Sequence, residues 1–215
     1  MTYEELKIQL DLNEPIDVLT FVGRQTKDKD WFVICDNGNC HLFNNDGNEI
    51  DVKKIKSLDE GLIPKYIKKI IVPDSVKYIR NWAFYNCINL TSINIPDSIE
   101  SIEDHAFAYC ESLTLINIPD LVESIGHHAF SDCRNWISLV ISDSVKSIGA
   151  YAFINCKNLT SITISDSIEY VGQNIFYNCK NLKSIIFKGK TIYQVKSMEY
   201  YPWGIEDELI IKCIN

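Results

Sequence analysis

The chain has 215 residues, of which 46% are hydrophobic and 23% are charged, and its formal net charge is −8. Such a composition is ordinary for a globular protein and fits one or two compact units, or one solenoid with caps. The acidic balance argues against a nucleic-acid partner, which requires clustered positive charge to displace counterions from phosphates. Because no run of 18 apolar residues is present, we expect no membrane insertion.

The first residues carry signals for a short helix. Thr2 and Glu5 fit a capping box, in which the Thr hydroxyl accepts from a helical N–H and the Glu carboxylate reaches back to the cap. We expect this helix to end near Leu10. The apolar residues of segment 13–22 fit either a helix or a strand, and the sequence leaves that choice open.

Residues 30–53 predict a three-stranded β-meander. An Asn-Gly pair lies between two of its apolar runs, and both residue types accept the positive φ of a tight hairpin turn. Cys35 and Cys40 then face each other across the turn, either as two thiols or as a disulfide. Cys40 and His41, with nearby carboxylates, also raise the hypothesis of a hydrolase-like site, although no triad order is visible.

A period of 23 residues governs the rest of the chain. Phenylalanine and cysteine each recur five times at this spacing, at Phe84, Phe107, Phe130, Phe153 and Phe176 and at Cys87, Cys110, Cys133, Cys156 and Cys179. A unit of this length cannot bury its own apolar face and must stack on the next. The period therefore predicts a solenoid in which each repeat is one rung and equivalent residues form columns.

Each repeat predicts the same local structure, which is clearest in residues 90–112. Ile93 and Ile95 alternate as in a strand, so we expect the first strands of all repeats to form one parallel sheet. A Pro-Asp-Ser turn follows, and Ile99 and Ile102 indicate a second, shorter extended piece. The Ala-Phe-x-x-Cys segment fits one helical or 3₁₀ turn. One cysteine per rung predicts a column of buried thiols that donate to turn carbonyls, in preference to disulfides or a metal site.

The unit L-x-x-I-x-I-P-x-S-[IV]-x-x-I-x-x-x-A-F-x-x-C-x-x resembles the BspA-type leucine-rich repeat. The resemblance covers about Ile67 to Phe187, with small departures: Ser142 and Ser165 replace Pro, and Trp136 stands at a Leu position. It implies an α/β, mostly β, solenoid: a curved, right-handed leucine-rich-repeat stack with a parallel sheet and a cap at each end. Members of this family usually act as protein-binding scaffolds, many of them on cell surfaces.

We divide the chain into an N-terminal cap at 1–62, a leucine-rich-repeat solenoid of about five full repeats at 63–188, and a C-terminal cap at 189–215. In the last part, Thr191 and Gln194 fit a second capping box, which opens a helix to about Tyr200. Residues 208–213 predict a final strand. Caps are needed because a terminal rung would otherwise expose its apolar side chains.

Outward positions on the predicted first strands form one candidate binding surface. They are small and weakly polar with two apolar interruptions, and the candidate residues are Asn94, Leu115, Asn117 and Val140. We expect contact with a protein partner at this surface. A merely solvated sheet is the alternative.

An aromatic stripe forms a second candidate surface, in the column just before Ala-Phe. Its residues are Trp82, His105, His128 and Tyr151. Aromatic residues are enriched where partners bind, and packing between rungs is the alternative. The histidines, together with His127 and Asp104, also have the donor types that zinc takes, although no single repeat carries a ligand spacing of its own.

Aspartates recur at the turn of each repeat, at Asp74, Asp97, Asp120, Asp143 and Asp166. Stacked carboxylates offer hard oxygen ligands for calcium. Aspartate also accepts from backbone N–H groups in turns, and we prefer this structural interpretation.

The sequence contains no nucleophile elbow, phosphate-binding glycine loop, His-Glu zinc motif or dinucleotide fingerprint. We therefore predict a non-catalytic protein–protein interaction scaffold, with no cofactor or metal, that binds a protein partner through the strand face or the aromatic stripe. The first residues lack the basic and apolar regions of a signal peptide, which predicts a cytoplasmic location. The alternative is a secreted or surface-displayed, adhesin-like repeat protein whose leader is missing from this sequence.

Overall fold

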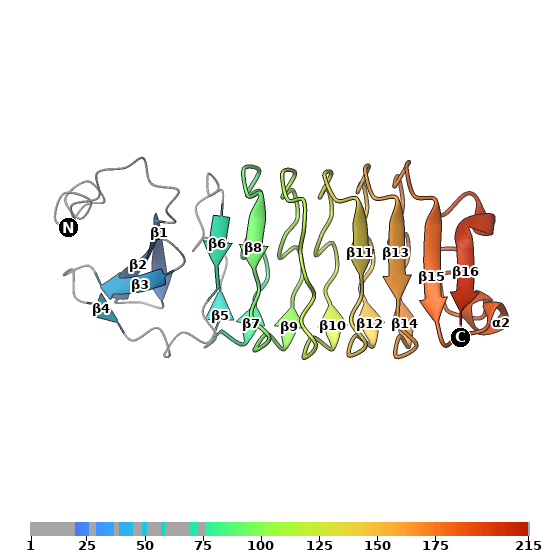
Figure 1. Ribbon diagram of the computed structural model, residues 1–215, viewed down its shortest axis with the longest axis horizontal. Helices are drawn as coiled ribbons and strands as arrows, with labels where there is room; N and C mark the ends of the chain where they lie inside the picture. Colours follow the sequence, from blue (N-terminus) through green and yellow to red (C-terminus); the bar gives the residue numbers. More distant parts are fainter. Residues whose placement is uncertain are drawn as a thin grey trace.

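The structure is a computed structural model that describes the backbone of residues 20–25, 29–36, 39–44, 49–50, 57–58, 69–72 and 76–214 (Figure 1). Side chains are described for residue 72 and for residues 76–214. The predicted helix at residues 2–10 lies outside the described residues.

An antiparallel sheet with the strand order β1-β2-β3-β4 forms near the N-terminus. Its strands are β1 (Thr20–Gln25), β2 (Lys29–Asp36), β3 (Asn39–Asn44) and β4 (Glu49–Ile50). The predicted meander is confirmed. Of the segment 13–22, for which helix and strand were both open, residues 20–22 belong to strand β1 and the rest lies outside the described residues. Cys35 and Cys40 are direct register partners in the β2–β3 pair.

The second extended pieces of the repeats build a sheet of six parallel strands in the order β14-β12-β10-β9-β7-β5. The strands are β5 (Ser57–Leu58), β7 (Tyr78–Ile79), β9 (Ser101–Ile102), β10 (Ser124–Ile125), β12 (Ser147–Ile148) and β14 (Tyr170–Val171). From β7 onward, the second residue of each strand is buried in the core. Because β5 pairs with β7, this sheet begins before residue 63.

The first strands do not form one sheet, which corrects the prediction. β6 (Lys69–Ile71) pairs with β8 (Ser92–Asn94), and a separate sheet has the order β11-β13-β15-β16. Its strands are β11 (Ser138–Val140), β13 (Ser161–Ile164), β15 (Ser184–Lys188) and β16 (Ile211–Ile214). Between the two sheets, Leu115 makes only an isolated bridge to Ser92. Figure 1 shows these strands side by side along the long axis.

The break in the first-strand ladder falls next to the rung of Trp136. This indole is fully buried where the equivalent residues are Leu90, Leu113 and Leu159. It packs against Phe130 and Phe153, with ring centroids 4.9 and 6.4 Å away. Trp136 is thus the largest side chain in its column, and it opens the first rung beyond the break.

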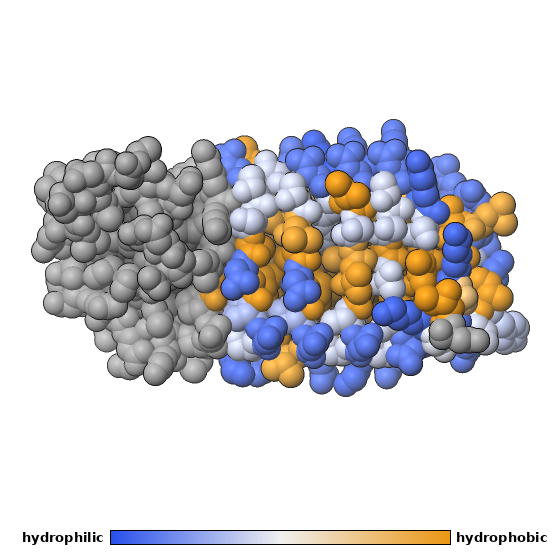
Figure 2. All heavy atoms as spheres, viewed as in Figure 1, coloured by the Kyte–Doolittle hydropathy of each residue, from blue (hydrophilic) through white to orange (hydrophobic). Residues whose placement is uncertain are grey.

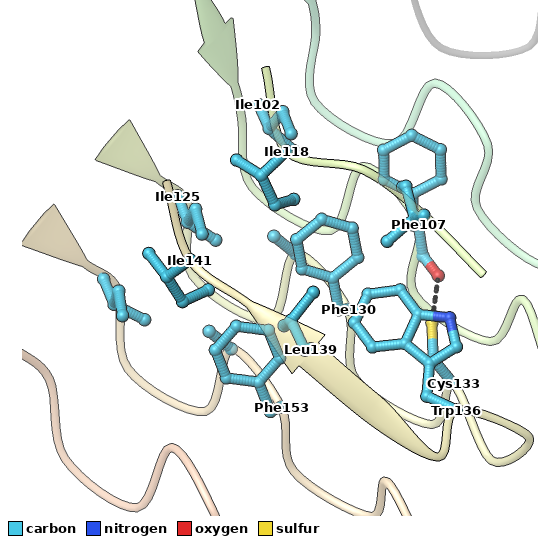
Figure 3. Packing of buried hydrophobic residues seen from close by; sticks show 14 of the residues in the cluster. Ile102, Phe107, Ile118, Ile125, Phe130, Cys133, Trp136, Leu139, Ile141 and Phe153 are labelled. Carbon is cyan, nitrogen blue, oxygen red and sulfur yellow. Dashed lines mark hydrogen bonds between the residues drawn. The ribbon is translucent and has the colours of Figure 1, made fainter. Parts of the chain in front are cut away.

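A file of stacked phenylalanines runs through the core, as predicted (Figure 3). All five rings are buried, and successive centroids are 4.8, 5.3, 5.8 and 6.0 Å apart from Phe84 to Phe176. Neighbouring rings are within 14° of parallel. The three inner rings therefore contact their equivalents on both adjacent rungs, and the two end rings contact one, which fixes the register of the stack.

The thiol column lies beside the phenylalanines, and its predicted hydrogen bonds to turn carbonyls are confirmed. The Sγ atoms of Cys110, Cys133, Cys156 and Cys179 donate to the carbonyls of Phe84, Phe107, Phe130 and Phe153, respectively, at 3.1–3.3 Å. Figure 3 shows the bond from Cys133 to Phe107. Burial raises the pKa values of Cys110, Cys133 and Cys156 well above the usual thiol value, so these groups remain protonated.

The Ala-Phe-x-x-Cys segment is not a helical turn, which corrects a second prediction. The N–H groups of Ala83, Tyr85 and Cys87 donate to carbonyls three residues earlier. The alternating N–H groups of Trp82, Phe84 and Asn86 instead donate to carbonyls of the next rung. A continuous helix would use every N–H internally, so the exchange of alternate bonds between rungs produces a series of overlapping turns.

The C-terminal segment covers the last rung. Thr191 and Gln194 form the predicted capping box, but α2 (Ile192–Lys196) ends well before the predicted Tyr200. At its C-terminal end, the Ser197 N–H donates to the carbonyls of Tyr193 and Gln194, and the Ser197 hydroxyl donates to the carbonyl of Gln194. The predicted strand at 208–213 begins as the 3₁₀ helix η2 (Glu208–Ile210) and becomes extended only in β16. In the described part of the chain, no helix has the length and hydrophobicity needed to span a bilayer.

Candidate interaction surfaces

The predicted aromatic stripe is a continuous stack of four rings. Centroids are 3.8 Å apart for Trp82 and His105, 4.8 Å for His105 and His128, and 4.9 Å for His128 and Tyr151. The planes of neighbouring rings differ by at most 12°. Since each ring covers the face of the next, the stack presents mainly ring edges to solvent, and packing between rungs explains much of its regularity.

All four residues of the stripe have left-handed backbones, with φ between 54° and 64°. This conformation is unusual for bulky residues and persists only where the surroundings impose it. Here the N–H groups of Trp82, His105 and His128 donate to the next rung at 2.8–3.0 Å. The same bonds that join the rungs therefore aim the rings along one line.

The two stacked histidines favour their neutral forms. Burial is the main cause that lowers the pKa of His105, followed by the neighbouring imidazole of His128. Burial likewise lowers the pKa of His128, with His127 as the next cause. Asp104 opposes both shifts without cancelling them. The stripe is therefore an uncharged aromatic surface at neutral pH.

His127 and Asp104 serve a separate structural ladder. The Oδ1 atom of Asn81 accepts from the Asp104 N–H at 2.9 Å, and Asp104 Oδ1 accepts from the His127 N–H at 2.7 Å. The Nδ1 atom of His127 then accepts from the Ala150 N–H at 2.9 Å. Sequence reasoning missed this role, whose only signal was the presence of an acceptor at the same position of three successive repeats.

The described residues do not assemble the zinc or calcium sites that the sequence raised as alternatives. Among the described residues, no three His, Cys, Asp or Glu side chains gather closely enough to hold a metal ion. The turn aspartates Asp97, Asp120, Asp143 and Asp166 are all exposed. Asp74 and the side chains of Cys40 and His41 lie outside the described residues.

The strand face carries an exposed apolar cluster in the middle of the stack. Leu115 is 72% exposed and Val140 is 61% exposed, and the predicted neighbours Asn94 and Asn117 are also exposed. Ile137, which sequence reasoning missed, is 64% exposed. Figure 2 shows hydrophobic residues along the middle of the visible face, with hydrophilic residues above and below. We call Leu115, Ile137 and Val140 the face patch.

The face patch departs from the pattern of its own columns. The position of Leu115 is Ser in the neighbouring rungs at Ser92 and Ser138, and the position of Ile137 is Thr at Thr114 and Thr160. No buried position of the repeat requires these apolar residues, because their side chains point away from the core. Exposed apolar residues that cluster within a polar surface are typical of contact sites.

The repeat region matches a known family. A family model described as the BspA type leucine rich repeat region, in 6 copies, matches residues 64–183. Comparison with curated proteins finds no match.

Several solved structures share the fold. One is a leucine-rich repeat protein from Bacteroides ovatus, 22% identical with a TM-score of 0.62, where the match covers 94% of this chain and 53% of that one. Another is a leucine rich cell surface protein from Faecalibacterium prausnitzii, 23% identical with a TM-score of 0.63, covering 78% and 42%. A third is the pneumococcal vaccine antigen PcpA, 22% identical with a TM-score of 0.56, covering 74% and 37%.

This chain therefore spans about half the length of these proteins, or less. At such low identity the likeness establishes the fold alone. The family model is more specific, since it matches more than half of the chain. The chain belongs to the BspA type leucine-rich repeat family.

Proposed function

We propose that the protein is a non-catalytic scaffold that binds a protein partner through the face patch on its first strands. The observation that carries this proposal is the exposure of three apolar side chains, Leu115, Ile137 and Val140, on two adjacent rungs of a regular stack. In the neighbouring rungs, Ser stands at the position of Leu115, Thr at that of Ile137, and Asn117 and Thr163 at that of Val140, so the fold does not require apolar residues there.

A rigid surface of this kind suits recognition of a folded partner. The residues beneath the patch are tied to both neighbouring rungs by packed rings and thiol hydrogen bonds. Little backbone freedom is then lost when a partner docks, which favours affinity. Asn94 and Asn117 flank the patch with exposed groups that donate and accept hydrogen bonds, as the polar margin of an interface does.

The test compares affinity capture by the full chain with capture by a variant that takes residues from neighbouring repeats. In the variant L115S/I137T/V140T, each residue becomes the one found in its own column, so folding should be preserved. We expect the captured partner to be lost by this variant. A melting curve that matches the original chain shows that the fold is intact.

A matched control uses Tyr193 and Leu209, which are even more exposed at 82% and 87% but lie in the C-terminal segment. The variant Y193S/L209S should retain the partner. A partner that stays with the face variant and leaves with this control would place the contact at the C-terminal end and overturn the proposal.

Surface display is a second candidate, favoured by the descriptions of two proteins with the same fold. One is described as a cell surface protein and the other as a vaccine antigen. If this protein is displayed in the same way, intact cells treated with an external protease should lose it. Protection from the protease until the cells are lysed would exclude display.

A further inference from the structure

A second ladder of hydrogen bonds runs through the residues that directly precede the core cysteines. Asp132, Asn155 and Asn178 occupy this position in successive rungs, with left-handed φ values of 58°, 62° and 61°. The Asp132 N–H donates to the carbonyl of Ile154 at 2.9 Å, and Asn155 Nδ2 donates to Asp132 Oδ2 at 3.0 Å. One rung later, the Asn155 N–H donates to the carbonyl of Tyr177 at 3.0 Å, and Asn178 Nδ2 donates to Asn155 Oδ1 at 2.6 Å.

In the rungs of Asp132 and Asn155, the backbone N–H and the side-chain oxygen are therefore hydrogen-bonded by the same short unit from the next rung. The unit is a backbone carbonyl followed directly by a residue with a side-chain carboxamide. Ile154 and Asn155 supply it to Asp132, and Tyr177 and Asn178 supply it to Asn155. These two rungs thus show which chemical groups bind at this position of the repeat.

The ladder ends at Asn178. Its Nδ2 is used by the preceding rung, while its N–H and its Oδ1 have no hydrogen-bond partner within the described chain. The C-terminal segment supplies one bond of a further rung, from the Phe176 N–H to the carbonyl of Trp203 at 3.1 Å. At the next residue, Gly204, φ is 85°, and the segment supplies no hydrogen bond to Asn178 within the described chain.

A cavity of about 430 Å³ lies between this last rung and residues 204–210 of the C-terminal segment. Asn178 lines it together with the buried Phe176 and the partly buried Leu182 and Ile205. The rest of the lining is partly polar, with the exposed side chains of Tyr177, Lys180, Glu206 and Asp207. The cavity thus has both apolar and polar walls, beside which Asn178 has one backbone donor and one carboxamide acceptor, and such a mixture suits a peptide.

We propose that this cavity binds a peptide segment of a partner protein. The segment contains an asparagine with a peptide carbonyl directly before it, and it adds one rung to the ladder. The carbonyl before the asparagine accepts from the Asn178 N–H, and the asparagine carboxamide donates to Asn178 Oδ1. Asn178 already has the backbone conformation of the occupied rungs, so binding requires little reorganisation. The site shares no residue with the face patch, and the two proposals stand or fall separately.

The experiment titrates the full chain with acetyl-Tyr-Asn-N-methylamide in a calorimeter. Saturable binding at one site is expected. Acetyl-Tyr-Leu-N-methylamide leaves Asn178 Oδ1 unpaired, and free asparagine lacks the preceding carbonyl, so each should bind at least about tenfold more weakly. Equal affinity for the three ligands, or no binding of the first at about 10 mM, contradicts the proposal.

Variants locate the site. Ile205→Trp fills the cavity and should abolish binding, whereas Ile88→Trp, at an exposed isoleucine that does not line the cavity, should leave binding unchanged. Asn178→Ala should weaken binding at least as much as loss of the asparagine from the peptide. Melting curves show whether each variant is folded. Unchanged binding by a folded Ile205→Trp chain would place the peptide elsewhere and overturn the proposal.

Discussion

The Sγ atom of Cys133 donates a hydrogen bond of 3.3 Å to the carbonyl oxygen of Phe107, 26 residues earlier in the chain. The thiol thus joins the two core columns across adjacent rungs, and burial raises its pKa well above the usual value. Because the thiolate is the reactive form, Cys110, Cys133 and Cys156 should resist iodoacetamide in the folded chain and react once denaturant is added. Mass spectrometry of the labelled peptides provides the measurement. The partly exposed Cys213 should react first, and labelling of Cys133 at the same rate would contradict its placement.

Truncation of the central phenylalanine should cost much of the stability of the protein. Phe130 is fully buried between Phe107 and Phe153, at centroid distances of 5.3 and 5.8 Å. We expect Phe130→Ala to lower the free energy of unfolding by about 3–5 kcal/mol, measured by guanidinium denaturation. Phe130→Leu keeps more of the volume and should lose clearly less. Equal losses for the two variants would mean that ring packing does not determine the stability of this rung.

Replacement of Trp136 should be unusually mild for a buried tryptophan. Its Nε1 is buried and has no hydrogen-bond partner among the described residues. A buried donor without a partner costs about 1–3 kcal/mol of stability. Trp136→Leu restores the residue found at Leu113 and Leu159 and removes that donor, although it also removes packed volume. We expect a net loss below about 1.5 kcal/mol, against the 3–5 kcal/mol typical of large core truncations. A loss of about 3–5 kcal/mol in the free energy of unfolding would show that packing of the indole outweighs the cost of its unpaired N–H.

Stability should fall as the solution becomes mildly acidic. The pKa values of His105 and His128 are lowered in the folded chain, so the folded form binds fewer protons than the unfolded form and the free energy of unfolding rises with pH. This contribution is present above the unfolded imidazole pKa of about 6.5 and is lost as the pH falls through the lower folded values. Protonation also places positive charge beside His127, with Asp104 and Asp132 as the nearby acids.

Urea midpoints at about pH 7.5 and about pH 5.5 measure this effect. The double variant H105Q/H128Q removes both titrating groups, and its midpoint should change less between the two conditions than that of the original chain. If the original chain and the variant lose the same stability, the effect comes from other groups.

Parts of the candidate sites could be read from the sequence and parts could not. The aromatic column was predictable because Trp82, His105, His128 and Tyr151 share one position of the period. Their face-to-face stacking was not, since it depends on left-handed backbones that local propensity disfavours for such residues. Ile137 was missed because it lies just before β11, outside the alternation that marks outward strand positions.

The repeat, the family and the contents of the core follow from the amino-acid sequence. A strict 23-residue period leaves stacking as the only way to bury Phe130 and its equivalents, so their single file follows from the spacing. Only the folded chain shows which rungs exchange which hydrogen bonds, that the first-strand ladder breaks beside Trp136, and that Asn178 has an unused donor and acceptor. These features depend on the positions of groups more than twenty residues apart. Local sequence preferences do not contain that information, because it arises only when the rungs are packed together.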